Sequence, residues 1–556
     1  MKLLLVAINA KYIHSNPAVY SLRACAGACA EHVEIAEYTI NRRTEEIRAD
    51  IYGRCPDVIA FSCYIWNREQ VCELIVDLKK LLPGTDIWVG GPEASCDAEA
   101  MLAALPLRGV MAGPGEETFF RLALAYLGGY QSRLPAVYAA PARALDSIPF
   151  WYEAMPEEAF ANRIVYYESS RGCPFSCSYC LSGLDRRLDF RNVFRVKREL
   201  DFFLARRTEQ VKFIDRTFNC RKAHALAIWR HILENDNGVT NFHFEIAADL
   251  LDEEQLEVLG RMRPGAVQLE IGVQSTNPRT LAAIQRKMDF EKVAYAVRRI
   301  QEAHNVHVHL DLIAGLPYED YESFAKSFNE VYALQPEQLQ LGFLKVLKGS
   351  LIEREKDRYE LLHTEKPPYE VLRTRWLSHD ELCRLKRVEE MVEVYHNSRQ
   401  FIRSLEWLLG CFSSPFAMFE ALADWYMSRE LLGLSLARVR RYEILRDFVA
   451  ARKPDGLETF KELLTMDLYL RENMKTRPCF APDRESHKAV MREWMKEEAR
   501  THRYLPAETA ATGRDLSHAV HWEYFTHMGE ASGLYLFTYR DRDPLTGNGR
   551  CLKIEP

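Results

Sequence analysis

At 556 residues, the chain is longer than one ordinary domain, and its length predicts about three domains. Hydrophobic residues make up 47% of the sequence, which is enough to build buried cores. The 73 basic and 79 acidic residues leave a net charge of −6, so the chain lacks the basic excess that typifies nucleic-acid-binding proteins. No apolar run in the sequence is long enough to cross a lipid bilayer.

The first residues and the cysteines indicate a cytoplasmic protein. The apolar start, Leu3–Ala7, is short and runs into the polar Asn9 and Lys11, so it predicts a buried strand rather than a signal peptide. Fourteen cysteines are too sparse in a chain of this length to form a disulfide scaffold. They are expected to be reduced thiols together with a metal site.

Residues 1–127 alternate short β-rich runs with helical patterns such as Pro17–Ala30 and Arg68–Leu82. This alternation is typical of a doubly wound, Rossmann-like parallel sheet. The expected strands are Leu3–Ala7, Val33–Glu37, Val58–Phe61, Ile87–Gly90 and Gly109–Ala112.

Small and polar residues follow the carboxyl ends of these strands, where doubly wound sheets bind their ligands. The fourth strand runs into Gly-Gly-Pro-Glu, and the fifth is followed by Gly-x-Gly-Glu-Glu. Glycine lets the backbone approach a large ligand closely. The candidate ligand-binding residues are Asn9, Tyr12, His14, Ser62, Tyr64, Gly90, Gly91, Pro92, Glu93, Gly113, Gly115 and Glu116.

A linker over residues 128–160 precedes a second predicted domain, which spans 161–350. Its first five strands are each followed by a helical pattern, such as Val193–Arg207 or Tyr321–Leu334. Six βα-like units predict a partial barrel, and barrels of this kind gather their chemistry at the carboxyl ends of the strands. The expected strands are Ile164–Glu168, Val211–Asp215, Phe242–Ile246, Val267–Ile271, Val306–Ile313 and Gln338–Leu344.

Three cysteines with the spacing C-x3-C-x2-C come directly after the first barrel strand: Cys173, Cys177 and Cys180. Cubane clusters normally take four thiolates, so three leave one iron open to a cofactor or substrate. A structural zinc site would need a fourth ligand nearby. No Cys or His lies in the loop that follows, and the next cysteine is Cys220. The motif therefore predicts a 4Fe-4S cluster.

The C-terminal residues 351–556 are predicted to form a mainly helical domain, with helical periodicity over 378–475 and a terminal β-hairpin. The expected hairpin strands are Leu534–Thr538 and Gly549–Ile554. In the N-terminal half, Cys25 and Cys29 lie one helical turn apart. They are expected to be buried apolar residues rather than ligands of a second cluster.

The cysteine motif, with an aromatic residue before its last cysteine, resembles the signature of the radical S-adenosylmethionine (SAM) superfamily. The resemblance implies that SAM binds the open iron and is cleaved to a 5′-deoxyadenosyl radical. It also implies an electron donor such as flavodoxin or ferredoxin. The residues that it implies for SAM binding are Tyr179, Asp215, Glu245, Gln274, Ser275, Arg286, Gly315 and Pro317.

Several of these residues have alternatives. Asp215 lies where many radical SAM enzymes carry Gly-Gly-Glu, and it can meet SAM, a substrate or a neighbouring arginine. Glu245 needs a ligand or a salt bridge, since a lone carboxylate inside a barrel is costly. Arg286 is expected to pair with the SAM carboxylate, unless it is a solvated helix residue.

The N-terminal domain resembles the cobalamin-binding domain, and the order of the domains resembles that of cobalamin-dependent radical SAM enzymes, including relatives with a helical C-terminal domain of unassigned function. The two glycine motifs carry this resemblance. The alternative is a flavodoxin-like domain that binds nothing at this edge. The D-x-H-x-x-G motif, whose histidine ligates cobalt in cobalamin-dependent methionine synthases, is absent from the sequence. His14 lies in the corresponding loop but out of register, where it is either near cobalt or a turn residue.

The sequence thus predicts a cobalamin-dependent radical SAM enzyme that methylates an unactivated carbon of a small-molecule or peptide substrate. One alternative is a radical rearrangement or cyclisation without methyl transfer. A second is a non-catalytic cobalamin-binding sensor. A third is a tRNA methylthiotransferase, which would require a second cluster; the near-neutral charge disfavours a nucleic-acid partner. No general acid or base residue can be assigned from the sequence.

Overall fold

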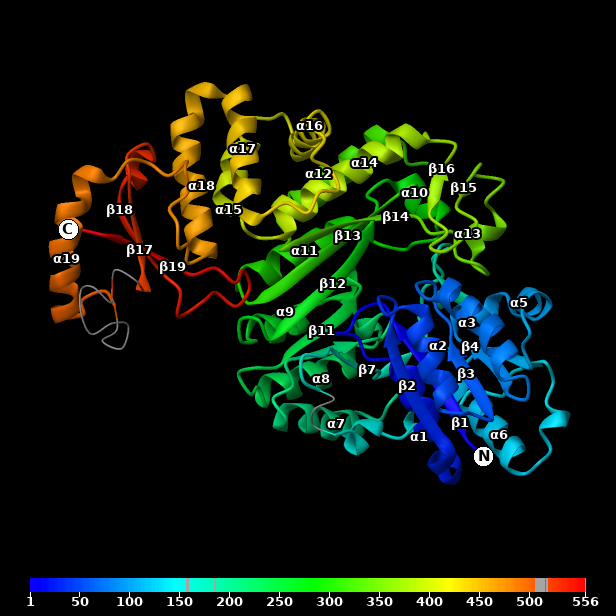
Figure 1. Cartoon of the computed structure of the whole chain (residues 1–556). Coiled ribbons are helices and arrows are strands. Elements are labelled where there is room, and N and C mark those ends of the chain that lie inside the picture. Colours follow the sequence, from blue (N-terminus) through cyan, green and yellow to red (C-terminus); the bar gives the residue numbers. More distant parts are fainter. Residues whose placement is uncertain (157–159, 185–186, 506–515, 517–518, 556) are drawn as a thin grey trace. The chain divides into compact units, whose positions relative to one another are not determined.

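The computed structural model shows an α/β protein with a helical C-terminal region (Figure 1). The chain folds into two compact units. Within the part of the chain that is described, no helix is both long and apolar enough to span a membrane. Unit 1 comprises 1–306, 313–320 and 342–379, and unit 2 comprises 307–312, 321–341 and 380–556. The described residues are 1–156, 160–184, 187–505, 516 and 519–555.

The N-terminal part of unit 1 is a parallel sheet with strand order β2-β1-β3-β4-β5-β6. All five predicted strands are confirmed. The sixth, β6, lies inside the predicted linker 128–160 and pairs with β5. The strands are β1 (Leu3–Asn9), β2 (Val33–Thr39), β3 (Val58–Ser62), β4 (Asp86–Gly90), β5 (Gly109–Met111) and β6 (Val137–Tyr138).

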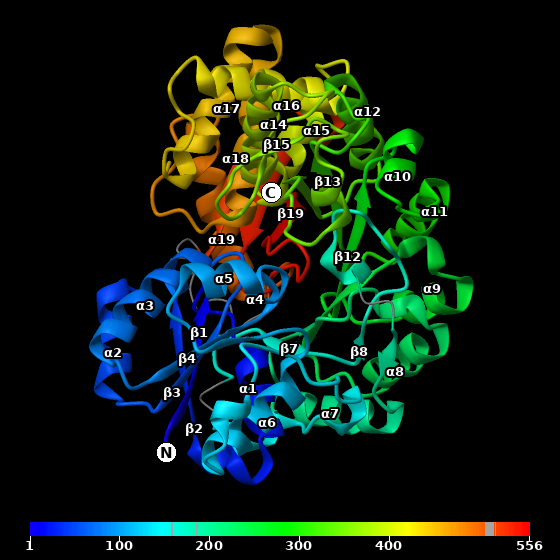
Figure 2. The ribbon, with the colours of Figure 1, turned by 90° about the vertical axis from the view of Figure 1, so that its right-hand side faces the viewer.

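Helices cover both faces of this sheet (Figure 2). In β1, Leu4 and Val6 pack toward α2 and α3, whereas Leu3 and Leu5 pack toward α1 and α6. This alternation explains why β1 is apolar at nearly every position, since a doubly covered parallel strand buries both of its faces. The helices are α1 (Pro17–Cys25), α2 (Thr44–Gly53), α3 (Arg68–Leu81), α4 (Pro92–Cys96), α5 (Ala98–Ala104) and α6 (Gly115–Leu127).

The six predicted barrel strands form one sheet with the order β14-β13-β12-β11-β10-β7. From β7 to β12, neighbouring strands all pair in parallel. The strands are β7 (Val165–Tyr167), β10 (Gln210–Phe213), β11 (Asn241–Ile246), β12 (Val267–Gln274), β13 (Val306–Ala314) and β14 (Gln338–Phe343). The helices between them are α7 (Val193–Ala205), α8 (Lys222–Glu234), α9 (Glu253–Gly260), α10 (Pro278–Ala283), α11 (Phe290–Gln301) and α12 (Tyr321–Tyr332).

One face of this sheet is an apolar layer under the helices. Phe213 of β10 and Phe244 of β11 lie 4.5 Å apart between ring centroids, and Phe244 also contacts Trp229 of α8. Because side chains alternate along a strand, the opposite face presents Lys212 and His243, which are paired in register. The inward face of the barrel is therefore polar.

Residues 342–379 belong to unit 1, so the compact units do not follow the predicted boundary at 350. This segment contains α13 (Leu351–Arg354), β15 (Leu362–His363) and β16 (Val371–Arg373). A further short antiparallel pair, β8 (Ser170–Arg171) and β9 (Asp189–Phe190), flanks the cysteine loop.

Unit 2 is mainly helical and ends in an antiparallel sheet with the order β17-β18-β19. The predicted hairpin is confirmed as β18 and β19, and β17 adds a third strand. Besides α12, its helices include α14 (His379–Met391), the π-helix η9 (Val392–Asn397), α15 (Ile402–Leu409), α16 (Pro415–Met427), α17 (Arg438–Arg452), α18 (Leu457–Arg471) and α19 (Lys488–Thr501). The strands are β17 (His521–Phe525), β18 (Gly533–Thr538) and β19 (Arg550–Ile554).

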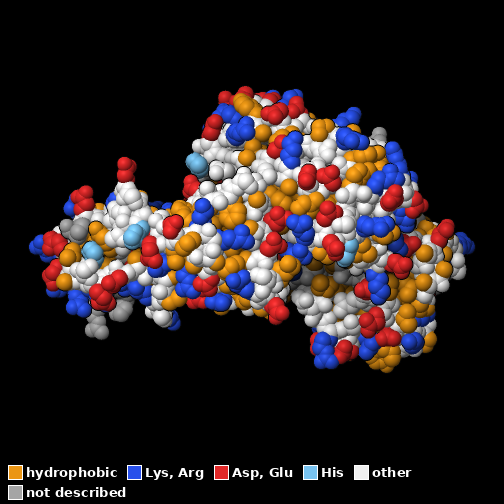
Figure 3. All heavy atoms as spheres, turned by 90° about the horizontal axis from the view of Figure 1, so that it is seen from above, with side chains coloured by type: hydrophobic (Ala, Val, Ile, Leu, Met, Phe, Trp, Pro, Cys, Tyr) orange, Lys and Arg blue, Asp and Glu red, His pale blue; other side chains and the backbone are white. Residues whose placement is uncertain are grey.

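Charges are mixed on the face of the molecule drawn in Figure 3, where basic and acidic side chains are interspersed. This agrees with a net charge of only −6. A stripe of basic residues, the electrostatic footprint of nucleic-acid binding, is not seen on the described surface of that face.

Candidate functional site

The cysteine loop follows β7, as predicted, after the short strand β8, which was not predicted. Its thiols are largely withdrawn from solvent. Cys173 and Cys177 are each 9% exposed, and Cys180 is half-buried. Gly172 adopts a φ of +94°, and a Cβ atom there would lie 1.9 Å from the carbonyl oxygen of Arg187. Only glycine permits this close approach of two backbone segments.

Backbone hydrogen bonds hold the middle of the loop in place. The amide of Ser178 donates to the carbonyl of Ile284 at 2.8 Å, and the amide of Ile352 donates to the carbonyl of Ser178 at 2.9 Å. The sulfur of Cys173 lies 3.4 Å from the hydroxyl of Thr217. Three free thiols on one anchored loop are soft ligands that suit an iron–sulfur cluster.

Asp215 is fully buried next to the start of this loop. One carboxylate oxygen accepts from the Ser169 amide at 2.9 Å, and the other accepts from the hydroxyls of Ser169 and Ser170, each at 2.6 Å. Burial raises the pKa of Asp215 to about 7 and lowers the pKa of His224, which lies 3.1 Å from the Ser169 hydroxyl, to about 4. The carboxylate is thus engaged with the chain, and its role in SAM binding stays a prediction.

Arg286 lies at the cysteine loop. Its Nη1 donates to the Cys177 sulfur at 3.7 Å, and its Nη2 donates to the carbonyl of Gly272. Gln274, at the end of β12, has a φ of +72° and a buried Oε1 atom that has no partner among the described residues. Burial raises the pKa of Tyr179, which precedes the last cysteine. An unsatisfied amide oxygen and a guanidinium beside the thiols fit a polar cofactor at this position.

The other residues predicted to bind SAM lie at neighbouring strand ends. Ser275 is buried and donates to Glu319 at 2.6 Å. Gly315 has a φ of +89°, and a Cβ atom there would lie 2.7 Å from Val371. Pro317, two residues further on, is buried.

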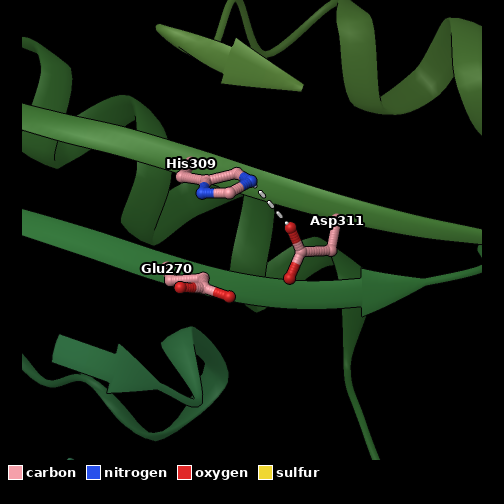
Figure 4. Close-up of side chains that lie close together, drawn as sticks. All are labelled: Glu270, His309 and Asp311. Atoms are coloured by element: carbon pink, nitrogen blue, oxygen red, sulfur yellow. Dashed lines mark ion pairs between the residues drawn. The ribbon is translucent and has the colours of Figure 1, made fainter. Parts of the chain in front are cut away.

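A polar cluster lies on the inward face of β10, β11 and β12. The carboxylate of Glu270 is 3.0 Å from Lys212 Nζ and 2.9 Å from His243 Nε2. Glu245 pairs in register with Glu270. Figure 4 shows Glu270 on β12, and on β13 it shows the ion pair His309–Asp311, at 2.9 Å.

The loop after β1 contacts the first strand of the barrel. Asn9 Nδ2 donates to the His14 carbonyl and to Glu37, each at 3.0 Å. His14 Nδ1 lies 2.6 Å from the Tyr166 hydroxyl. Burial, with Lys11 and Lys212 nearby, lowers the pKa of His14 and so favours its neutral imidazole. The structure shows this contact for His14, and any contact of His14 with cobalt stays a prediction. Tyr12 is 65% exposed.

The glycines at the sheet edge differ in the space around them. A Cβ atom at Gly91 would lie 2.5 Å from the Cys63 carbonyl oxygen, and one at Gly115 would lie 2.9 Å from Leu22. At Gly90 it would meet the side chain of Met111 at 3.3 Å. Gly113, with a φ of +73°, has no described atom within 4 Å of that position. Gly113 is therefore the glycine at this edge that leaves room for a ligand.

Two acidic residues of this region, Glu93 and Asp97, contact the distant segment 342–379 of unit 1, one through a hydrogen bond and the other through an ion pair. Glu93, which follows Pro92 in α4, is 5% exposed and accepts from Arg68 at 3.1 Å and from the Tyr369 hydroxyl at 2.7 Å. Lys348 contacts Asp97, just after α4, at 2.5 Å. Their role at this edge is thus to hold residues 342–379, and any contact of Glu93 with cobalamin stays a prediction.

Glu116 links the N-terminal sheet to the cysteine loop. Arg171, two residues before Cys173, donates to both Glu116 oxygens, at 2.8 and 3.3 Å. Arg171 also donates to Glu168 at 2.9 and 2.7 Å. Burial raises the pKa of Glu116 and Arg171 lowers it, and the net shift is downward.

A cavity of about 190 Å³ lies where these elements meet. Tyr64, which follows Ser62 at the end of β3, lines the cavity and stacks on Trp66 at 4.4 Å. Other lining residues are Ser21, Glu116, Tyr166, Glu168 and Arg171. The cavity thus joins the predicted cobalamin edge to the first strand of the barrel.

Sequence reasoning missed several residues of this junction. Arg171 could have been found from the sequence, because it lies two residues before the first cysteine of the motif. Tyr166 and Glu37 had none, since their partners lie far along the chain: 152 residues separate Tyr166 from His14, and 126 separate Glu37 from Arg163. Among the predicted bystanders, Cys25 is buried, as expected.

Three family models match successive parts of the chain. The B12 binding domain matches residues 3–123, the Radical SAM superfamily matches 167–331, and the "Protein of unknown function (DUF4080)" matches 357–533. These matches confirm the predicted order of the domains.

The chain is also similar to curated methyltransferases. It is 24% identical over 453 residues to the cobalamin-dependent radical SAM methyltransferase TokK of Streptomyces tokunonensis, covering 71% of this chain and 65% of TokK. It is 26% identical over 314 residues to the 2-(S-pantetheinyl)-carbapenam-3-carboxylate methyltransferase of Streptantibioticus cattleyicolor, covering 48% of this chain and 44% of that protein. The chain therefore spans less than two thirds of the length of each.

Among solved structures, the cobalamin-dependent S-adenosylmethionine radical enzyme OxsB, with aqua-cobalamin and SAM bound, has a TM-score of 0.53 and 15% identity. The similarity covers 84% of this chain and 78% of that chain. At this identity, the likeness establishes a shared fold.

Proposed function

We propose that the chain is a cobalamin-dependent radical SAM methyltransferase, because successive parts of it match the B12 binding domain and the Radical SAM superfamily. The observation that carries this proposal is the buried cysteine loop at the carboxyl end of β7, tied by Arg171 to Glu116 at the carboxyl edge of the N-terminal sheet. A methyl donor at that edge and a radical source at the loop would face the same junction. Fold alone does not fix the reaction, so the chemistry of these residues matters.

The residues fit three cofactors. Cys173, Cys177 and Cys180 would hold the cluster, and the unsatisfied amide oxygen of Gln274 would accept a hydrogen bond from SAM. The open space at Gly113 would admit cobalamin. When bound, the cluster and SAM supply a 5′-deoxyadenosyl radical, and cobalamin supplies the methyl group. The protein contributes position and exclusion of water.

The substrate would lie against the inward face of the barrel. An ordinary barrel interior is filled by apolar side chains, whereas β10 to β12 present Lys212, His243 and Glu270 there. Lys212 and Glu270 remain 24% and 22% exposed, so these groups can meet a ligand. Because this face carries both a basic and an acidic side chain, it favours a polar small molecule or peptide as the substrate over a hydrocarbon.

A cytoplasmic location and an electron donor such as flavodoxin or ferredoxin are part of the same proposal. All fourteen cysteines of the chain are free thiols, as expected of a protein kept in a reducing compartment. A reducing donor would be required, because the cluster would have to be supplied with the electron that cleaves SAM.

Metal loading tests the proposal. After anaerobic incubation with iron, sulfide and hydroxocobalamin, we expect about four irons per chain, together with bound cobalt. Cys177→Ala should lose the iron and keep the cobalt, and Cys411→Ala, a change of a half-buried cysteine outside the loop, should keep both. Iron retained in Cys173→Ala, Cys177→Ala and Cys180→Ala alike would contradict the cluster assignment.

A further inference from the structure

The guanidinium of Arg286 is held against a predicted cluster ligand. Arg286 and Cys177 are 109 residues apart in sequence, yet Nη1 donates to the sulfur at 3.7 Å. Its other anchor is the carbonyl of Gly272 in β12. A Cβ atom at Gly272 would lie 3.4 Å from Nη2 and 2.3 Å from Gln274 Nε2, so the absence of a side chain at Gly272 makes room for this arrangement.

Among the described residues, no carboxylate forms an ion pair with Arg286, and Asp249 acts on its charge only through a longer-range electrostatic interaction. The Nε atom of Arg286 is buried without a hydrogen-bond acceptor in that part of the chain. A cation withdrawn from water is costly unless an anion compensates it. Arg286 contacts the sulfur of Cys177, which would carry negative charge as a cluster ligand, so the two charges would then stabilise each other.

We propose that Arg286 raises the reduction potential of the cluster held by the cysteine loop, through its charge and its hydrogen bond to Cys177. This rests on the proposed function, because it requires the cluster. Hydrogen bonds to cluster sulfurs and nearby charge are among the factors that set such potentials. Reduction adds one negative charge to the cluster, so a fixed cation beside a ligand sulfur stabilises the reduced state more than the oxidised state.

The hydrogen bond from Arg286 to the Cys177 sulfur leaves other donors of the guanidinium available for a second partner. A guanidinium has five donors in a fixed fork, and Nε of Arg286 makes no hydrogen bond to any described residue. Arg286 can therefore also meet the SAM carboxylate while it contacts the sulfur. The two roles are separable, because tuning of the potential operates before SAM binds.

The test is a redox titration of the reconstituted full-length protein without SAM, followed by electron paramagnetic resonance of the reduced cluster. At a fixed potential, Arg286→Gln should show at least a tenfold lower ratio of reduced to oxidised cluster, equivalent to a midpoint about 59 mV more negative. Arg286→Lys, which keeps the charge but not the fork, should fall between Arg286→Gln and the wild type. Arg279→Gln removes the same charge from the exposed start of α10 and should leave the midpoint unchanged.

An unchanged midpoint in Arg286→Gln would overturn the inference, and weakened SAM binding with that unchanged midpoint would assign Arg286 to SAM alone. If Arg286→Gln takes up no iron, the Arg286→Lys midpoint decides: a shift supports the inference, and a wild-type value overturns it. Failure of the wild type to take up iron would instead refute the proposed function.

Discussion

The ion pair between Arg171 and Glu116 should measurably stabilise the junction of the two domains. Glu116 is 7% exposed and receives two hydrogen bonds from Arg171, at 2.8 and 3.3 Å. Glu116→Gln keeps one acceptor oxygen and loses the charge. A hydrogen bond to a charged group contributes about 1.5–3 kcal/mol, and Arg171 retains Glu168. We therefore expect the unfolding free energy to fall by about 2 kcal/mol.

The measurement is urea unfolding of the reduced protein without cofactors, because urea, unlike guanidinium, does not screen ion pairs. A double-mutant cycle with Arg171→Met should give a coupling energy of about 1–2 kcal/mol. Glu117→Gln is the matched control, since Glu117 lies next in α6 and pairs with Arg121 and Arg143 instead. A coupling between positions 171 and 116 no larger than that between 171 and 117 would refute the argument.

Three further predictions concern other parts of unit 1. Burial raises the folded pKa of Asp215 to about 7, above its ordinary value of about 3.9. The contribution of Asp215 to the unfolding free energy is therefore present below pH 4 and is lost as the pH rises to 7. Asp215→Asn should remove the fall in unfolding free energy between pH 5 and pH 7.5, measured by urea unfolding, and an identical fall in the variant would contradict the argument. Gly113→Phe should abolish cobalt loading, whereas Gly129→Phe, which has a similar φ of +72° and open space, should preserve it; equal loading would exclude cobalamin from this edge. Tyr369→Phe should lower the unfolding free energy by about 1.5–3 kcal/mol because Glu93 loses its 2.7 Å donor, and an unchanged unfolding curve would argue against a role of Glu93 in holding residues 342–379.

The elements were predictable where a local pattern marks them. The continuous apolar run of Val58–Phe61 predicted β3, and the structure places it at Val58–Ser62. The cysteine loop was equally local, because both the spacing and the preceding strand lie within a few residues. β6 has only two residues, Val137 and Tyr138, which is too short for any periodic pattern.

The partners of the site residues were less predictable, because they depend on contacts between distant segments. The sequence indicated that Glu93 and Glu116 lie at the carboxyl edge of a sheet, and they do. It gave no means of pairing Glu93 with Tyr369, which is 276 residues away. Arg286 was expected to meet SAM, and its contact with Cys177 required the folded chain.

The most direct test of the central claim is the formation of 5′-deoxyadenosine. The reconstituted protein, with bound iron and cobalt quantified, would be incubated anaerobically with SAM and a strong reductant. We predict 5′-deoxyadenosine in the wild type and none in Cys177→Ala. Iron and cobalt bound at full occupancy, with no 5′-deoxyadenosine even when a panel of polar small molecules and peptides is added, would contradict a radical SAM enzyme and favour a cobalamin-binding sensor.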